Sequence, residues 1–213
     1  MADQLYLSLW YPNFRLDALP AALVAVMQQF ARVGGGPRVH AASAIPIGWN
    51  EPPVYQRLYV NHEQAEDDGA SLPPNAVSEA TEQLYADMAF EFELRWPLWS
   101  PELVPAELDG GLDPIWKQQS SIVRIVGFGP EFDDASFEQN GHIRVDFGLD
   151  SPFLLEEVEL DPIATQRVQQ NVEMLLAFTL SVEKHCGISS RLLWTESGEP
   201  FAQKLIDRLQ RVN

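Results

Sequence analysis

The sequence predicts an α+β protein that has a mixed or mostly antiparallel sheet with helices packed on one face. Apolar and charged residues alternate strictly in residues 90–96 and again in 142–147, a period of two that is typical of strands with one buried and one polar face. Other stretches, above all the one after Asp161, repeat apolar residues at helical spacing. Because 213 residues can bury one large core, we expect a single α+β domain over residues 1–213.

The N-terminal half predicts six elements in the succession β-α-β-β-α-β. The first strand is apolar on both faces, as in the centre of a sheet, and the helix after it is expected to begin at an Asp17 cap and to end at Gly34. This succession is that of a ferredoxin-like unit, by element order alone. The elements are strands at 5–11, 39–47, 54–60 and 88–99, the helix after Asp17, a helix at 75–87 capped by Asn75, and a polar loop at 61–75.

The C-terminal half predicts a proline-rich excursion, two strands and two helices. Residues 97–114 contain four prolines and a glycine pair, and we expect Trp96, Trp99 and Trp116 to hold this irregular segment against the body of the protein. Asn140-Gly141 is typical of a type I′ hairpin turn. The remaining elements are strands at 122–128 and 142–147, the latter paired through that turn with an arm at 136–139, a long helix from Asp161-Pro162 to Gly187, an edge strand at 192–194 and a helix from Pro200.

The charge of the chain restricts its partners. The 31 acidic and 14 basic side chains give a formal net charge of −17, which repels phosphate backbones, so we expect no nucleic-acid binding; a basic protein partner would be attracted. Cys186 is the only cysteine, which fits a reducing compartment, and neither a signal peptide nor an apolar run of membrane-spanning length is evident. We therefore expect a cytoplasmic protein with no membrane association. No particular oligomeric state is indicated.

No sequence motif for a cofactor or a common catalytic mechanism is present, so no cofactor and no catalytic residue is assigned. A Walker loop, a nucleophile elbow and a C-x-x-C pair are all missing. The candidate binding residues are the charged side chains of the polar strand faces. These are Glu91, Glu93, Arg95, Arg124, His142, Arg144 and Asp146.

Two interpretations of these charged residues are open. They form a cross-strand charge ladder, which we favour because alternation groups them automatically, or they form a surface that binds a partner. Arg124 is central to the choice, because an arginine inside an apolar strand must reach solvent or pair with a carboxylate, for which Asp146 and Glu93 are the expected partners.

The leading functional hypothesis is a non-enzymatic protein-interaction module, of the immunity-protein or inhibitor type, with an acidic surface that neutralises a basic partner. Whether the chain is an enzyme is left open. The alternative is a metal-assisted hydrolase, because hard cations prefer clustered oxygen ligands. A third hypothesis is a small-molecule binder in which Trp96, Trp99 and Trp116 surround the polar face of the sheet. The residues of the hydrolase alternative are Asp133, Asp134, Glu138, His142 and Asp146.

Overall fold

The computed structural model describes residues 2–59, 72–102, 115–155, 161–198 and 201–210. They form an α+β fold whose seven-stranded sheet has the order β3-β2-β4-β5-β6-β1-β7, and every neighbouring pair is antiparallel. The strands are β1 (Gln4–Trp10), β2 (Ala41–Pro46), β3 (Tyr55–Leu58), β4 (Met88–Glu102), β5 (Ile115–Phe128), β6 (Ile143–Leu149) and β7 (Ser190–Thr195).

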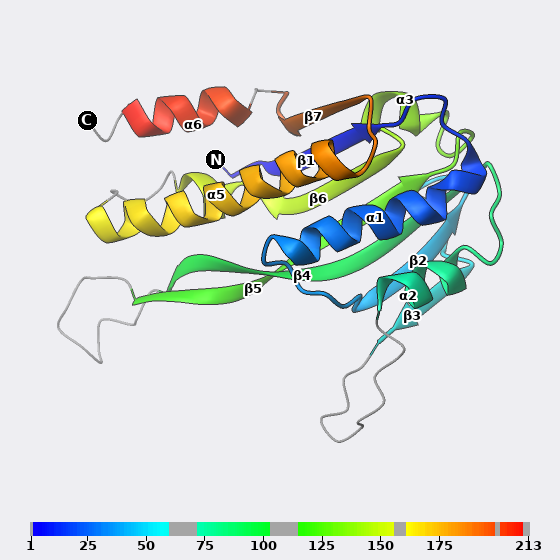
Figure 1. Ribbon diagram of the computed structural model, residues 1–213, viewed down its shortest axis with the longest axis horizontal. Coiled ribbons are helices and arrows are strands. Elements are labelled where there is room, and N and C mark those ends of the chain that lie inside the picture. Colours follow the sequence, from blue (N-terminus) through cyan, green and yellow to red (C-terminus); the bar gives the residue numbers. More distant parts are fainter. Residues whose placement is uncertain (1, 60–71, 103–114, 156–160, 199–200, 211–213) are drawn as a thin grey trace, which may run out of the picture.

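The long helices lie together on one face of this sheet, as the sequence predicts (Figure 1). Helices α1 and α5 contact each other and the central strands, while α2 contacts α1 and β2. The last helix contacts β7 and α4. The helices are α1 (Leu19–Arg32), preceded by a 3-10 turn at Leu16–Ala18, α2 (Pro73–Ala80), α3 (Ser136–Asn140), α4 (Ser151–Leu154), α5 (Pro162–His185) and α6 (Phe201–Gln210).

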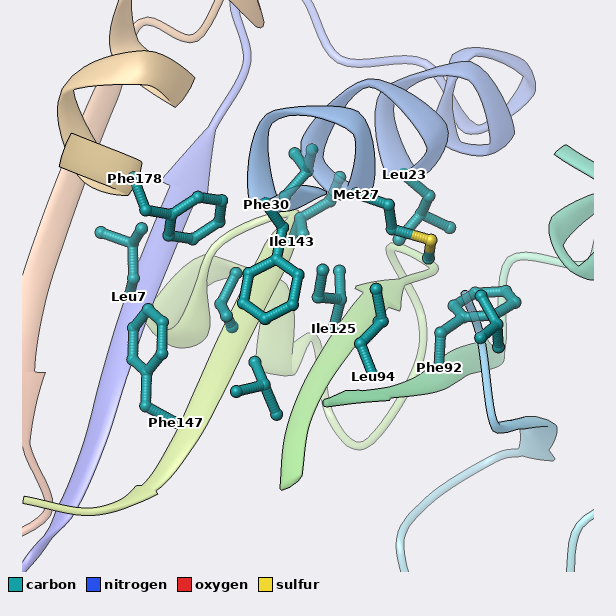
Figure 2. Close-up of a cluster of buried hydrophobic side chains, with 14 of the residues drawn as sticks. Leu7, Leu23, Met27, Phe30, Phe92, Leu94, Ile125, Ile143, Phe147 and Phe178 are labelled. Atoms are coloured by element: carbon teal, nitrogen blue, oxygen red, sulfur yellow. The ribbon is translucent and has the colours of Figure 1, made fainter. Parts of the chain in front are cut away.

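The core lies between these helices and the apolar faces of the strands (Figure 2). Phe92 and Leu94 of β4 are completely buried beneath α1, which confirms the alternation predicted for residues 90–96. Trp96 continues the same face and is also fully buried, with its ring centroid 5.2 Å from that of Phe30 and 5.6 Å from that of Phe147. Removal of these large apolar surfaces from water is the main stabilising term of the fold.

A ferredoxin-like unit is not confirmed. The chain does run from β1 through α1, β2, β3 and α2 to β4, but the strands pair differently. In the sheet, β1 lies between β6 and β7, and β5 and β6 separate it from β4. The order of elements along a chain does not determine which strands meet, and here the C-terminal half supplies both neighbours of the first strand.

The hairpin expected at Asn140-Gly141 is not formed. Residues 136–140 are the short helix α3, in which the Asn140 side chain donates to Ser136 Oγ at 2.7 Å. Gly141 does have a positive φ, 87°, but this conformation connects the end of α3 to the start of β6. Strand β6 therefore pairs with β1 and β5 and not with an arm at 136–139.

The irregular excursion expected at 97–114 is also corrected. Residues 97–102 continue β4 and residues 115–121 begin β5, so the two strands form one long hairpin; residues 103–114 lie outside the described part of the chain. Pro97 and Pro101 are tolerated because β2 pairs with β4 only as far as Glu93, which leaves the outer edge of β4 without a strand beyond that point. Trp96 packs in the core rather than holding a loop.

Of the three predicted helix caps, one is confirmed. Asp161 accepts the backbone N–H of Ala164 at 2.7 Å, and Pro162 follows it at the first helical position. The caps expected at Asp17 and Asn75 are wrong: α1 and α2 are preceded by Ala18 and Leu72, and neither makes a side-chain cap bond. The loop expected at 61–75 lies mostly outside the described residues.

Candidate interaction surface

The face of the sheet opposite the long helices is the candidate functional site, and we call it the open face. Strand alternation directs charged and aromatic side chains to it from five neighbouring strands. One end of this face is covered by the segment 129–140 and by Trp49, which pack on Phe128 and Val126. The residues that define the open face are Tyr6 and Ser8 of β1, Glu91, Glu93 and Arg95 of β4, Ile122, Arg124 and Val126 of β5, Arg144 and Asp146 of β6, and Leu192 and Trp194 of β7.

A ladder of ion pairs crosses β4 and β5 on this face. Arg95 contacts Glu93 at 3.2 Å, and Arg124 lies 3.9 Å from Glu93 and 3.7 Å from Glu91. Burial is the main cause that raises the pKa of Glu91, and the nearby Arg124 guanidinium opposes this shift. Of the two partners expected for Arg124, Glu93 is therefore found, as the charge-ladder interpretation of β4 and β5 predicts. Asp146 lies opposite Arg124 in register, but its carboxylate accepts the backbone N–H of Gly148 at 2.8 Å instead.

Arg144 lies beside the ladder and is enclosed by aromatic rings. Its guanidinium carbon is 5.0 Å from the ring centroid of Tyr6, 5.7 Å from that of Trp49 and 5.5 Å from that of Phe128. Its Nε is buried and has no hydrogen-bond acceptor among the residues that the structure describes. Burial lowers the pKa of Arg144, although the guanidinium remains a cation at every physiological pH.

Further aromatic side chains extend this cluster towards β7. The rings of Tyr6 and Trp194 are 4.6 Å apart, and the Trp194 indole N–H donates to Ser8 Oγ at 3.0 Å. The sequence-based reasoning missed Tyr6, Trp49 and Trp194. Their positions depend on β1 lying between β6 and β7 and on the path of the loop that carries Trp49. The pairing of β1 with β6 would have indicated Tyr6, and its pairing with β7 would have indicated Trp194.

His142 is not part of the open face, although alternation grouped it with Arg144 and Asp146. It precedes β6, and its Nδ1 accepts the backbone N–H of Tyr11 at 2.9 Å. Its ring stacks on Phe14 with centroids 4.1 Å apart and is 8% exposed. Burial lowers the pKa of His142, so the neutral imidazole that this hydrogen bond requires is favoured.

The structure does not bring together the residues of the hydrolase alternative. Asp133 and Asp134 lie in a turn with left-handed backbone, Glu138 is in α3, and His142 is engaged with Tyr11. Within the described ranges, no three histidine, cysteine, aspartate or glutamate side chains are grouped so that they could hold a metal ion. Trp99, named for the small-molecule hypothesis, lies against Arg167 of α5, whose guanidinium carbon is 3.7 Å from the centroid of the indole ring.

The charges on the open face balance, with three carboxylates against three arginines. The excess of acid lies elsewhere in the sequence. The stretches 60–71, 103–114 and 156–160 contain ten acidic residues and no lysine or arginine. The negative net charge and the polar sheet face are therefore two separate features of this protein.

A second polar group lies away from the open face, between β3 and α2. One carboxylate oxygen of Glu79 accepts from the hydroxyls of Tyr55 and Tyr59, both at 3.1 Å, and from Arg57 at 2.7 Å. A small pocket beside it has a floor that includes Ala44 and Met88. Three donors already satisfy this oxygen of Glu79. These hydrogen bonds attach β3 to α2, so the group has a structural role.

No protein-family model, curated protein or solved structure matches this chain. Within the described residues, no helix combines the length and apolar character needed to cross a membrane.

Proposed function

We propose that the protein is a non-enzymatic interaction module that binds a basic protein partner through the open face, in the manner of an immunity protein or inhibitor. The observation that carries this proposal is the composition of the open face, where arginine, tryptophan and tyrosine side chains gather on a surface that α1, α2 and α5 leave free. These residue types dominate the energetic centres of protein interfaces.

The net charge supports the choice of a basic partner. A charge of −17 raises the rate of encounter with a positively charged protein, while the charge-balanced open face would supply the close contacts. We further propose that the protein acts in the cytoplasm, since a single cysteine suits a reducing compartment.

The proposal is tested with a partner captured from cells of the source organism, purified, and titrated calorimetrically at about 50 and about 300 mM salt. We expect the dissociation constant to rise about tenfold or more over this range, because salt screens the long-range attraction. A dissociation constant that is the same at both salt concentrations would argue against electrostatic recognition.

Two matched pairs of variants locate the binding surface. Glu93→Lys on the open face and Glu173→Lys on the exposed side of α5 change the net charge equally. Leu192→Asp on the open face and Leu180→Asp on α5 form the second pair, in which each change adds one negative charge. The two leucines are 52% and 58% exposed. We expect only the open-face members to weaken binding, by about tenfold or more, with unchanged melting temperatures for the leucine variants. Equal losses within each pair would overturn the proposal.

A further inference from the structure

Arg144 differs from every other charged side chain of the described open face. The other five each make an ion pair or a hydrogen bond, and these contacts occupy Glu91, Glu93, Arg95, Arg124 and Asp146 with one another or with backbone. Arg144 makes neither, although it is mostly buried among Tyr6, Trp49 and Phe128. A desolvated cation with unused donors is costly unless something supplies an acceptor.

We propose that Arg144 is an anchor that binds a carboxylate side chain of the partner protein. This inference rests on the proposed function and deepens it. The guanidinium is a planar fork of N–H donors, and a carboxylate is the protein group that matches this fork with two parallel hydrogen bonds. The Nε is fully covered, so the partner carboxylate would bind the two terminal nitrogens, neither of which is among the enclosed unpaired atoms.

The carboxylates already present on the open face do not take this role. Glu91 and Arg144 are separated by Val126, which lies between them in the strand register, and Glu91 contacts Arg124 instead. Asp146 is held by the backbone N–H of Gly148. Both carboxylates attract the Arg144 cation through space and raise its pKa, but among the described residues neither makes an ion pair or a hydrogen bond with it.

Such an anchor would give the interaction its specificity. The net charge attracts any basic protein, whereas Arg144 would increase the affinity only for a partner that places a carboxylate against its guanidinium. A partner without this group would bury the guanidinium still further and leave it unpaired. The aromatic rings around Arg144 provide the apolar rim that excludes water from such a contact.

The test uses sodium acetate as the probe and the intact protein labelled with ¹⁵N at arginine and tryptophan side chains. Acetate is titrated against sodium chloride at equal ionic strength, and the Arg144 Nε–H and Trp49 indole signals are followed by NMR, with assignment from Arg144→Lys and Trp49→Phe. We expect saturable shifts of both signals with acetate only. Shifts that are the same in chloride would show that Arg144 is only a structural cation–π contact and would overturn the proposal.

Two variants give the control. Arg144→Lys keeps the charge and loses the planar fork, so we expect acetate to shift the Trp49 indole signal with about tenfold weaker affinity. Arg15→Lys replaces an exposed arginine that pairs with Asp17, and the acetate titration should be unchanged. If Arg144→Lys binds acetate as the parent protein does, the anchor is wrong.

The same variants separate this inference from the proposed function. A partner whose salt-dependent binding through the open face is unaffected by Arg144→Lys would overturn the anchor and leave the interaction module standing. Acetate bound at Arg144, with a partner that prefers the α5 side in the matched pairs, would overturn the proposed function and leave a carboxylate site.

Discussion

Several polar groups of single residues form hydrogen bonds with backbone N–H and C=O groups that the strands leave unpaired. Asn171 of α5 is completely buried, and its amide bonds both the N–H and the C=O of Trp99 and also the C=O of Pro152. The amide thus replaces a neighbouring strand at the outer edge of β4, where β2 no longer reaches. Gly36 and His40 donate backbone N–H groups to the same edge, at Arg95 and Glu93.

His142 should make the stability of the protein depend on pH. Burial places its pKa below the ordinary value of 6.5, so below pH 6.5 the unfolded chain takes up a proton that the folded chain resists. The contribution is complete above pH 6.5 and is lost as the pH falls towards the folded pKa. In His142→Asn, the side-chain oxygen can still accept from Tyr11, and urea unfolding should show a smaller loss of stability between pH 7.5 and pH 5 than in the parent protein. Identical pH profiles would contradict this role.

Gly141 should be far more sensitive to a side chain than other glycines with positive φ. A Cβ on Gly141 would lie 2.7 Å from the Leu9 backbone nitrogen, whereas one on Gly187, whose φ is 66°, would meet nothing within 4 Å. We expect Gly141→Ala to lower the free energy of unfolding by about 3 kcal/mol or more and Gly187→Ala by about 1 kcal/mol. Urea denaturation of both variants measures the difference, and equal losses would mean that backbone strain alone matters.

At the scale of elements, the sequence predicts strands and long helices well where one chemical pattern dominates. The alternation in β4 and the Asp161 cap of α5 are both confirmed. Prolines and the Asn-Gly pair misled the interpretation because each has more than one structural use. Pro97 and Pro101 lie in a strand whose outer edge needs no donor, and Gly141 ends a helical turn instead of making a hairpin.

The same limit applies to the candidate site. Alternation correctly placed Glu91, Glu93, Arg95, Arg124, Arg144 and Asp146 on one kind of face, and the Glu93–Arg124 contact follows from neighbouring strands. The aromatic surroundings of Arg144 come from β1 and from the loop that carries Trp49, which are distant in sequence. Periodicity within a strand contains no information about such neighbours.

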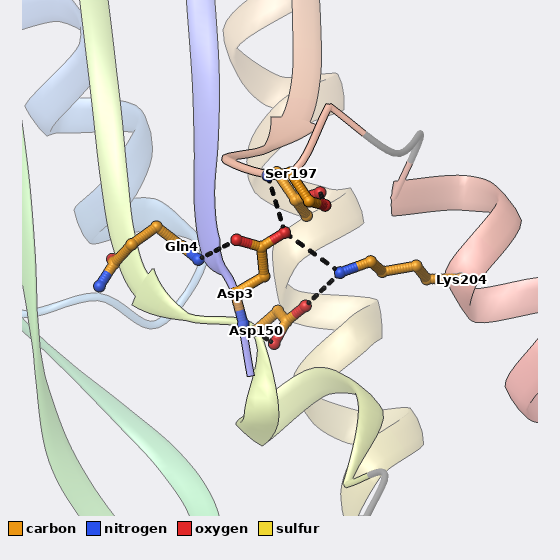
Figure 3. Close-up of polar contacts among 6 residues, drawn as sticks. Asp3, Gln4, Asp150, Ser197 and Lys204 are labelled. Atoms are coloured by element: carbon orange, nitrogen blue, oxygen red, sulfur yellow. Dashed lines mark hydrogen bonds and ion pairs between the residues drawn. The ribbon is translucent and has the colours of Figure 1, made fainter. Parts of the chain in front are cut away.

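Attachment of α6 to the rest of the protein should depend on Lys204. Its ammonium contacts Asp3 at 3.3 Å and Asp150 at 3.2 Å, and the lysine and Asp150 side chains are only 12% and 2% exposed (Figure 3). Hydrogen bonds from Ser197 are the main cause that lowers the pKa of Asp3, so this carboxylate stays charged. Removal of the cation would leave two carboxylates facing each other without a counter-charge.

We therefore expect Lys204→Met to lower the free energy of unfolding of α6 by about 2 kcal/mol. Hydrogen exchange of the backbone amides at 203–205 measures this change and should accelerate about thirtyfold, while amides of β4 stay protected. Ala202→Met, on the exposed side of the same helix, is the control. Unchanged exchange in Lys204→Met would mean that Phe201, which packs against Phe153, is sufficient to hold α6.

For the whole molecule, the net charge should make stability depend on salt. The charge of −17 creates repulsion that the compact state concentrates, and salt screens it. We expect the melting temperature to rise by about 3 °C or more between about 20 and about 300 mM sodium chloride. Differential scanning calorimetry gives the shift. A fall over this range would mean that attractive ladders such as Glu93 with Arg95 outweigh the overall repulsion.

The place of β1 in the sheet has a consequence for synthesis on the ribosome. Residues 4–10 pair on one side with 143–149 and on the other with 190–195, so the first described strand cannot complete its pairing until residues well over 100 positions later have been synthesised. Such distant pairing is typical of slow folding. A nascent chain that ends before residue 190 would lack β7 and would leave the backbone groups of one edge of β1 open to pairing with other chains during translation.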